Sequence, residues 1–366
     1  MKKISLNSAK IESQVSTFTQ KQFFAFLIVF ITHHSSLIIN HSFAQDAQFS
    51  QFFSAPVLTN PAFAGNMEYD CKDLKSNLKA TLNSRRQWGN FQTDAISLEY
   101  FNKKKRTGLA FIAQNHRVGE ARLQSTLIGL VASYKLQLNS QWNFNSGLQI
   151  SMGNRNLGFS NLKFTDQFTD EGYNGKQTID NTKNTASVFY PDVSAGGIVF
   201  SRDFWMGVSF HHLNMPNISN LGHTERLPIK FAIQGGYKFE FRSNRTFGNF
   251  KKDISLKPVY QLRFQGPFNQ MDLGMYYTNE PLVLGVMYRG IPVGKKGADN
   301  LISQDAIVLL LGYKQDGFKL GYSFDAGLSK IGLLGGGSHE ISLSFQYAKK
   351  GCKRRKYGKW VPIPAF

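Results

Sequence analysis

The sequence WNFNSGLQISM, from Trp142 to Met152, alternates apolar and polar residues along most of its length. The apolar side chains share one parity: Trp142, Phe144, Leu148, Ile150 and Met152. The side chains of the other parity are polar: Asn143, Asn145, Gln149 and Ser151. Because successive side chains of a β-strand point to opposite faces, this stretch is predicted to be a strand with one apolar and one polar face.

The same alternation returns along the chain, for example in IKFAIQGGYKFEF (229–241), FKLGYSFD (318–325) and EISLSFQY (340–347). No comparable stretch after residue 67 has the 3.6-residue period of a helix. The alternating segments predict fourteen strands, at residues 78–88, 92–101, 107–115, 121–138, 142–157, 186–201, 203–212, 228–241, 254–264, 270–278, 281–289, 305–315, 317–327 and 338–348.

The connections between these strands differ in length at the two ends. After predicted strands 4, 6, 10 and 12 they are only NSQ, SRD, NE and QDG, and after strands 5, 7, 11 and 13 they are long. Short turns at one end and long loops at the other are typical of outer-membrane barrels. The sequence therefore predicts an all-β protein, a transmembrane β-barrel of fourteen antiparallel strands within residues 71–348. The even number of strands places both termini of the chain in the periplasm.

A soluble β-sandwich or propeller is the alternative architecture. A sandwich with this many polar faces would lack a sufficient core, and no repeat of propeller-blade length is present. Trp88, Trp142 and Trp205 fall at the ends of predicted strands, so a barrel would place them in the aromatic girdle at the membrane interface.

The N-terminal residues have the features of a secretory signal. Lysines precede the apolar stretch FFAFLIVFI, Phe23 to Ile31, which is shorter than the roughly 20 residues of a membrane-spanning helix. Ser42 and Ala44 are the small residues of a cleavage site. Residues 1–44 are therefore predicted to be a signal peptide; an uncleaved membrane anchor is the alternative.

Composition limits the possible partners. The formal net charge is +19, which is compatible with nucleic acid or with an anionic membrane surface. No nucleic-acid-binding motif occurs, so we expect no nucleic acid as a partner. The basic residues cluster only in the C-terminal tail, 349–366, which includes Lys353, Arg354, Arg355 and Lys356. This tail is predicted to lie in the periplasm and to contact lipid headgroups or a protein; a solvated tail is the alternative.

The segment AQFSQFFSAPVLTNPAFAGN, Ala47 to Asn66, precedes the first predicted strand. Helical spacing of its first aromatic residues predicts a short helix ended by Pro56. Asn60 before Pro61 predicts the start of a second helical turn, and Gly65 its end. Residues 45–70 are predicted to form a plug inside the barrel, against inward apolar residues such as Tyr276 or Phe101; a partner-bound or disordered arm is the alternative. The plug or partner-binding residues are predicted to be Phe49, Phe52, Phe53, Asn60, Pro61, Phe63 and Gly65.

The chain has two cysteines, Cys71 before the first predicted strand and Cys352 after the last. The first and last strands of a closed barrel are neighbours, and the periplasm is oxidising. A Cys71–Cys352 disulfide is therefore predicted, with free thiols or mixed disulfides as the alternative.

Motifs for catalysis or cofactor binding are absent from the sequence. His211 and His212 are adjacent on a predicted strand, so they are expected to point to opposite faces and not to bind one metal ion together. We expect no enzyme activity, no cofactor and no metal site.

Several segments resemble the PorP/SprF family of type IX secretion system membrane proteins. They are QFSQFFSAPVLTNPAFAGN (48–66), NSRRQWGNFQT (83–93), LKFTDQF (162–168), MGVSFHHLNMP (206–216), LGYSFDAGLSKI (320–331) and GGSHEISLSFQY (336–347), in the family's order. Asn60-Pro61-Ala62 is also similar to the fatty-acid-transporter-like barrels, which have fourteen strands and an N-terminal plug. The end of the chain, AKKGCKRRKYGKWVPIPAF (348–366), does not match the family.

The resemblance implies an outer-membrane protein that serves type IX secretion or gliding motility. It implies secretion-system components, a large cell-surface adhesin cargo and a periplasmic peptidoglycan-linked protein as partners. A transport channel for a small solute is the alternative function, and an enzyme is the third and least supported class.

Overall fold

The computed structural model describes residues 46–70, 77–87, 90–119, 123–156, 165–170, 172–176, 187–219, 224–241, 246–247, 250–290, 304–328, 336–347, 353–354 and 360–364. The predicted signal peptide, Trp88, Cys71 and Cys352 lie outside these residues. Among the described residues, no helix combines the length and the hydrophobicity needed to cross a membrane.

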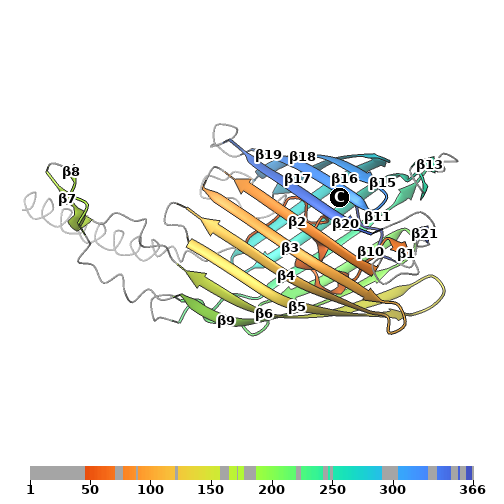
Figure 1. Cartoon of the computed structure of the whole chain (residues 1–366), viewed down its shortest axis with the longest axis horizontal. Coiled ribbons are helices and arrows are strands. Elements are labelled where there is room, and N and C mark those ends of the chain that lie inside the picture. The colour runs from red at the N-terminus through yellow and green to blue at the C-terminus, as the bar shows by residue number, and fades with distance from the viewer. Residues whose placement is uncertain are drawn as a thin grey trace, which may run out of the picture. The chain divides into compact units, whose positions relative to one another are not determined.

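Fourteen long strands of the described chain form a closed antiparallel barrel (Figure 1). They are β2 (Leu78–Gln87), β3 (Phe91–Asn102), β4 (Thr107–Val118), β5 (Leu123–Gln137), β6 (Asn143–Asn156), β9 (Val188–Phe200), β10 (Phe204–His211), β11 (Lys230–Tyr237), β15 (Ile254–Gln265), β16 (Phe268–Asn279), β17 (Leu282–Gly290), β18 (Gln304–Gln315), β19 (Phe318–Gly327) and β20 (Ser338–Gln346). Pairing of β2 with β20 joins the first and last strands, and pairing of β11 with β15 completes the ring. The predicted all-β barrel and its strand count are confirmed.

The remaining elements are short and are not among the fourteen long strands of the ring. β12 (Phe239–Glu240) continues the wall beside β15. Three two-stranded ribbons join β1 (Tyr69–Asp70) to β21 (Lys353–Arg354), β7 (Phe168–Thr169) to β8 (Gly172–Tyr173), and β13 (Thr246–Phe247) to β14 (Phe250–Lys251). The helical turns are α2 (Pro56–Thr59), η1 (Pro61–Phe63) and η4 (Thr165–Gln167).

The alternation of the sequence becomes an apolar outer face and a polar inner face. On β19, Leu320 and Tyr322 are each 42% exposed on the outside, whereas Ser323 and Asp325 are 0% and 4% exposed on the inside. A soluble protein buries its apolar residues and exposes its charges. The inverse arrangement seen here suits a wall whose outer face contacts lipid.

The two ends of the barrel are built differently. At the end called here the turn end, short connections join β3 to β4, β5 to β6, β9 to β10, β16 to β17 and β18 to β19. Asp316 and Gly317 form the last of these with φ angles of 44° and 93°, which suit a two-residue hairpin turn. The opposite, loop end carries the long connections after β6, β10, β17 and β19, and short connections from β2 to β3, from β4 to β5 and, at Gly266, from β15 to β16. In outer-membrane barrels of the usual organisation, the end with short turns is the periplasmic one.

One tryptophan occupies a different place from the one expected. Trp142 lies at the turn end, where its ring meets Phe204 at a centroid distance of 6.0 Å. Trp205 was expected in the aromatic girdle, but it points into the barrel and is fully buried. The prediction for Trp205 was wrong because it shares the inward parity of Gly207 and Ser209, and an apolar segment inside the barrel covers it.

Candidate functional site

Residues 46–69, called here the lumen segment, run through the interior of the barrel from the loop end to the turn end. Asp46 contacts His212 and Lys230 beside the loop connection between β10 and β11. Glu68 contacts Lys314 and Lys319, which lie next to the turn between β18 and β19. The segment also touches inward-facing residues of β4, β6, β10, β16 and β20.

The local structure of the lumen segment differs in part from the prediction. Residues 49–53 were expected to be helical, but they form an irregular turn. Pro56 was expected to end a helix, whereas it begins α2, because proline lacks the N–H that the first turn of a helix leaves unbonded. The second prediction is confirmed: the Asn60 side chain accepts a hydrogen bond from the Ala62 N–H at 2.9 Å, with Pro61 at the first position of η1.

Aromatic side chains hold the lumen segment at its middle. The Phe53 ring meets the edges of Trp205 and Tyr276, at centroid distances of 5.6 and 6.0 Å. The Phe63 ring meets Trp205 at 5.6 Å. Edge-to-face pairs at this spacing are favourable beyond the area that they bury. Tyr276 was expected as part of the seat, whereas Trp205 was missed, although its inward parity could have identified it.

Glycines on the barrel wall make room for the turn at Asn60–Gly65. A Cβ atom at Gly108 would lie 2.1 Å from the Ala64 carbonyl oxygen, and one at Gly147 would lie 2.3 Å from the Ala62 nitrogen. A Cβ atom at Gly196 would lie 2.1 Å from the Asn60 Oδ1. Any side chain at these positions of β4, β6 and β9 would collide with the segment, so the wall and the segment have complementary shapes.

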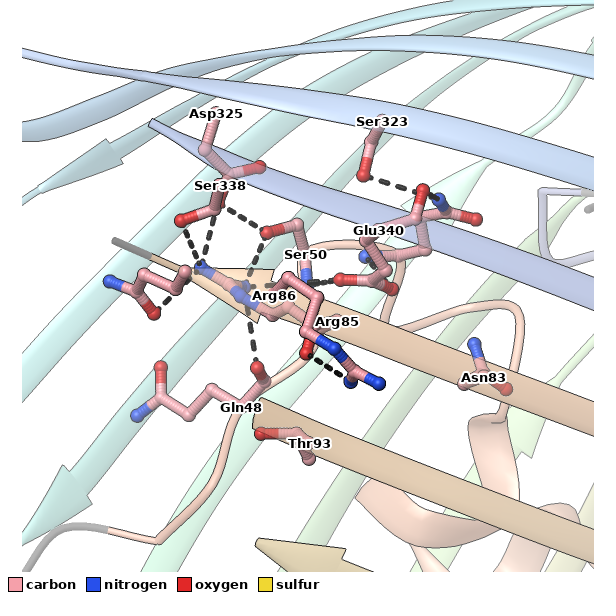
Figure 2. Close-up of polar contacts among 12 residues, drawn as sticks. Gln48, Ser50, Asn83, Arg85, Arg86, Thr93, Ser323, Asp325, Ser338 and Glu340 are labelled. Carbon is pink, nitrogen blue, oxygen red and sulfur yellow. Dashed lines mark hydrogen bonds and ion pairs between the residues drawn. The ribbon is translucent and has the colours of Figure 1, made fainter. Parts of the chain in front are cut away.

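Charged groups of the wall bind the start of the segment (Figure 2). The backbone N–H groups of Ser50 and Gln51 donate to the two Glu340 carboxylate oxygens, at 2.7 and 3.0 Å. The Ser50 hydroxyl donates to Asp325 at 2.6 Å. Arg85 donates to Asp325 at 2.9 Å and to the Ser50 hydroxyl oxygen at 2.6 Å. Each buried charge therefore has an opposite charge or a backbone dipole beside it, as burial requires.

Asp46 is held at the loop end by an ion cluster. Its carboxylate accepts from His212 Nε2 at 2.8 Å and from the Lys230 ammonium, and His212 Nδ1 contacts Asp192 at 2.8 Å. Burial disfavours the imidazolium, but the two carboxylates outweigh it and raise the pKa of His212 to about 9. His212 is therefore charged at neutral pH and bridges the segment to the wall.

The His212 bridge should weaken at high pH. Since the folded pKa of about 9 exceeds the ordinary 6.5, its stabilisation is fully present below pH 6.5 and is lost as the pH rises through 9. We expect amide hydrogen exchange of residues 46–51, corrected for its intrinsic pH dependence, to rise as the pH passes 9. The His212→Gln variant should lack this step; an identical step in the variant would contradict the assignment.

The expectation for His211 and His212 needs correction. They were expected to point to opposite faces, but both are buried inside the barrel. The reason is that β10 ends at His211 and that His212 adopts a φ of 60°, which breaks the alternation of the strand. Ser194 and the Thr59 carbonyl hold His211, at 3.1 Å each. The described part of the chain contains no group of three or more potential ligands arranged for a metal ion.

The end of the chain returns to the barrel interior. Residues 360–364 are buried, and Val361 and Ile363 belong to the same apolar cluster as Phe53 and Trp205. The Val361 N–H donates to the Asn66 side chain at 2.9 Å. The whole tail, 349–366, was expected to be a basic segment in the periplasm. Residues 360–364 differ from that expectation, because their sequence, WVPIP, is apolar and is buried against the lumen segment. The structure describes Lys353 and Arg354 as β21, and Arg355 and Lys356 lie outside the described residues.

The disulfide between Cys71 and Cys352 remains a prediction. Its support is the antiparallel pairing of the residues beside each cysteine, Tyr69 with Arg354 and Asp70 with Lys353. We expect peptide mass spectrometry of the unreduced, purified protein to find a linked Cys71–Cys352 peptide. Two thiols that both react with an alkylating agent would reject the bond.

Comparison with known proteins decides the family. A family model described as type IX secretion system membrane protein PorP/SprF matches residues 41–345. The chain belongs to the PorP/SprF family. As a PorP/SprF protein with a β-barrel fold, it is a type IX secretion component of the outer membrane.

Solved structures were also compared with this PorP/SprF protein. The outer membrane protein Omp33 of Acinetobacter baumannii is 8% identical, with coverage of 75% of this chain and 99% of that chain and a TM-score of 0.39. The CymD monoaromatic hydrocarbon channel is 13% identical, with coverage of 81% and 94% and a TM-score of 0.41. The P. putida toluene transporter TodX is 10% identical, with coverage of 81% and 94% and a TM-score of 0.40. The comparison with curated proteins found no match.

Proposed function

We propose that this PorP/SprF protein is a closed barrel that serves type IX secretion and gliding motility as an accessory and anchoring component, with the lumen segment as its plug. The observation that carries the proposal is the burial of polar side chains around most of the inner circumference. Examples from five strands, each at most 2% exposed, are Ser97, Gln149, Gln234, Asp272 and Glu340. A water-filled channel would leave such side chains exposed.

Because a closed lumen passes no solute, the proposed binding surfaces lie at the two ends of the barrel. The loop end would face the cell surface and bind a large adhesin cargo. The turn end, with β1, β21 and the basic residues Lys353, Arg354, Arg355 and Lys356, would face the periplasm and bind a peptidoglycan-linked protein of the secretion machinery or anionic lipid. This division rests on the usual orientation of such barrels.

We also propose that the role is not catalytic. The Ser194 hydroxyl lies 3.1 Å from His211 Nδ1, and serine–histidine pairs of this kind are used in nucleophilic catalysis. Both residues are buried, and His211 Nε2 donates to the Thr59 carbonyl of the lumen segment. A substrate could reach this serine only after the segment had left the barrel.

Two measurements together test the proposed function. In planar bilayers, the purified full chain should conduct poorly, and a deletion strain should lose a surface adhesin from its surface and secreted proteome. A steady, solute-selective conductance, with an unchanged surface proteome and lost uptake of one solute, would instead support the alternative of a transport channel.

Neighbouring glycines on β9 offer a matched test of the plug. Gly196→Ala places a methyl group against Asn60, whereas Gly197→Ala points outward and meets the Phe144 ring at 3.2 Å and the Asn145 carbonyl oxygen at 3.9 Å. We expect Gly196→Ala to cost about 1–3 kcal/mol by overpacking and to raise both conductance and protease cleavage within residues 46–66. Gly197→Ala should behave as wild type. Equal conductance and equal protease cleavage of the two variants would contradict the proposal that the lumen segment is a plug.

A further inference from the structure

One side of the outer wall carries a row of polar side chains near the loop end, although most of the outer face is apolar. Near the loop end, five outward-facing residues of neighbouring strands lie opposite one another, and we call them the outer polar row: His339, Arg86, Gln92, Arg117 and Gln124. The row crosses β20, β2, β3, β4 and β5. Its members face away from the lumen, because Arg85, Thr93 and other residues of the opposite parity are buried inside.

The next outward row toward the turn end includes Ser84, Asp94 and Asn115 and is polar as well. We call the two rows together the polar patch, and hydrogen bonds connect them. Asp94 accepts from the Ser84 hydroxyl at 2.7 Å, from Arg86 Nη1 at 3.0 Å and from the Gln92 amide. On the next strands, Gln124 donates to Asn115 at 2.9 Å. These cross-strand bonds fix the direction of the long side chains, so the patch is an ordered surface.

Apolar side chains border the patch directly. Toward the turn end, the next outward row on β2–β5 is Leu82, Ile96, Ala113 and Ile128. On the opposite wall, the outward residues near the loop end are mostly apolar, with Leu273 opposite Tyr288 and Tyr288 opposite Ile307, while Asn269 and Asp305 are polar positions of the same outward parity. The polar patch therefore lies on one side of the barrel, at the edge of the lipid-facing band that is nearer the loop end.

The chemistry of the outer polar row suits a phosphorylated sugar. The Arg86 side chain is 50% exposed and Arg117 is exposed, and one strand separates them, which sets their backbones about 10 Å apart. Guanidinium groups bind phosphate by paired hydrogen bonds. The Gln92 and Gln124 amides beside them can bond hydroxyl groups. Asp94, the carboxylate of the patch, pairs with Arg86, so the two arginines and this aspartate together keep one net positive charge.

We propose that the outer polar row binds the anionic sugar headgroup of a glycolipid in the outer leaflet of the membrane. The guanidinium groups of Arg86 and Arg117 hold phosphate, and the amides between and beside them hold the sugar. This contact fixes the barrel's rotation and depth on the side where β2 and β20 close it, and it is independent of the proposed role in secretion.

Native mass spectrometry of the detergent-purified full chain tests the proposal, with lipid A, a diphosphorylated glucosamine lipid, as the probe. The comparison arms are dephosphorylated lipid A and phosphatidylglycerol. The variants are Arg86→Gln with Arg117→Gln, and the control Arg202→Gln, an exposed arginine at the turn end. We expect the double variant to bind lipid A about 30-fold more weakly, since each arginine near an anionic surface contributes about fivefold. The control should bind as wild type.

Other results would overturn the proposal. Unchanged lipid A binding by the double variant, while its heat-dependent gel mobility shows a folded barrel, would exclude the arginines as ligands. Equal binding of dephosphorylated lipid A would exclude phosphate recognition, and equal binding of phosphatidylglycerol would exclude recognition of the sugar. A photo-crosslinker at Gln92 that captures a protein rather than glycolipid in cells would assign the patch to a protein partner.

Discussion

Replacing Phe52 and Phe53 together with alanine should release the lumen segment and strongly destabilise the folded protein. Each side chain is 2% exposed, and Phe53 packs against Trp205 and Tyr276. Loss of a buried phenylalanine costs about 3–5 kcal/mol per site, because a cavity remains where the ring was. We expect a lower midpoint of urea unfolding in detergent micelles and faster proteolysis between residues 46 and 66.

A matched control separates this effect from a general loss of aromatic residues. Phe345 lies on the outer face of β20 and is 50% exposed, so Phe345→Ala should change micellar stability by far less than either inner substitution. If the double variant unfolds at the wild-type urea concentration and resists protease like wild type, the segment contributes little to the folded barrel. If it unfolds early while its conductance stays low, the segment stabilises the barrel without closing it.

The substitution Asp325→Asn should have a comparably large effect. The Asp325 carboxylate accepts from Arg85 at 2.9 Å, from Arg289 at 3.0 Å and from the Ser50 hydroxyl at 2.6 Å, all inside the barrel. Asparagine keeps the shape of the side chain but removes its negative charge. The buried guanidinium groups of Arg85 and Arg289 then have less negative charge beside them. Breaking a buried ion pair by removing one partner typically costs about 3–5 kcal/mol.

The measurement is the free energy of unfolding in micelles, together with crosslinking of residue 48 to β2 as a local probe of the segment. The control is Asp203→Asn, because the Arg202–Asp203 contact of 3.7 Å is exposed at the turn between β9 and β10. Such surface pairs contribute about 0–1 kcal/mol. Equal losses in the two variants would mean that the inner network does not depend on the Asp325 charge.

The architecture was readable from the sequence because a strand imposes a period of two on its side chains. Each of the fourteen alternating segments became a strand of the wall, with bounds that differ by a few residues. The largest difference is in the segment 228–241, where β11 ends at Tyr237. There the Lys238 N–H donates to the Asp203 carbonyl at 2.7 Å, and its side chain turns inward to Asp253. The alternation of apolar and polar residues does not reveal such hydrogen bonds, so it could not predict the end of β11.

Some parts of the candidate site were also predictable. The Asn60-Pro61 pair marks a helical start by local chemistry alone, since an amide caps the turn and proline needs no N–H partner. The many phenylalanines of the lumen segment predicted that the segment is buried, because apolar side chains are unfavourable in water. Phe49, Phe52, Phe53 and Phe63 are all buried in the barrel interior.

The strands, the face of most side chains, the outer-membrane barrel and the likeness to the PorP/SprF family could be predicted from the sequence, because all of these follow from local periodicity and local motifs. Contacts between residues distant in the sequence could be seen only in the folded barrel. It placed Trp205 under Phe53 and Phe63, Glu340 on the Ser50 and Gln51 amides, and the WVPIP end against Asn66. The physical reason is that closure of the sheet brings inward faces from all sides of the ring onto one interior. A charge in that interior can persist only beside a partner that the closed ring, and not the neighbouring sequence, supplies.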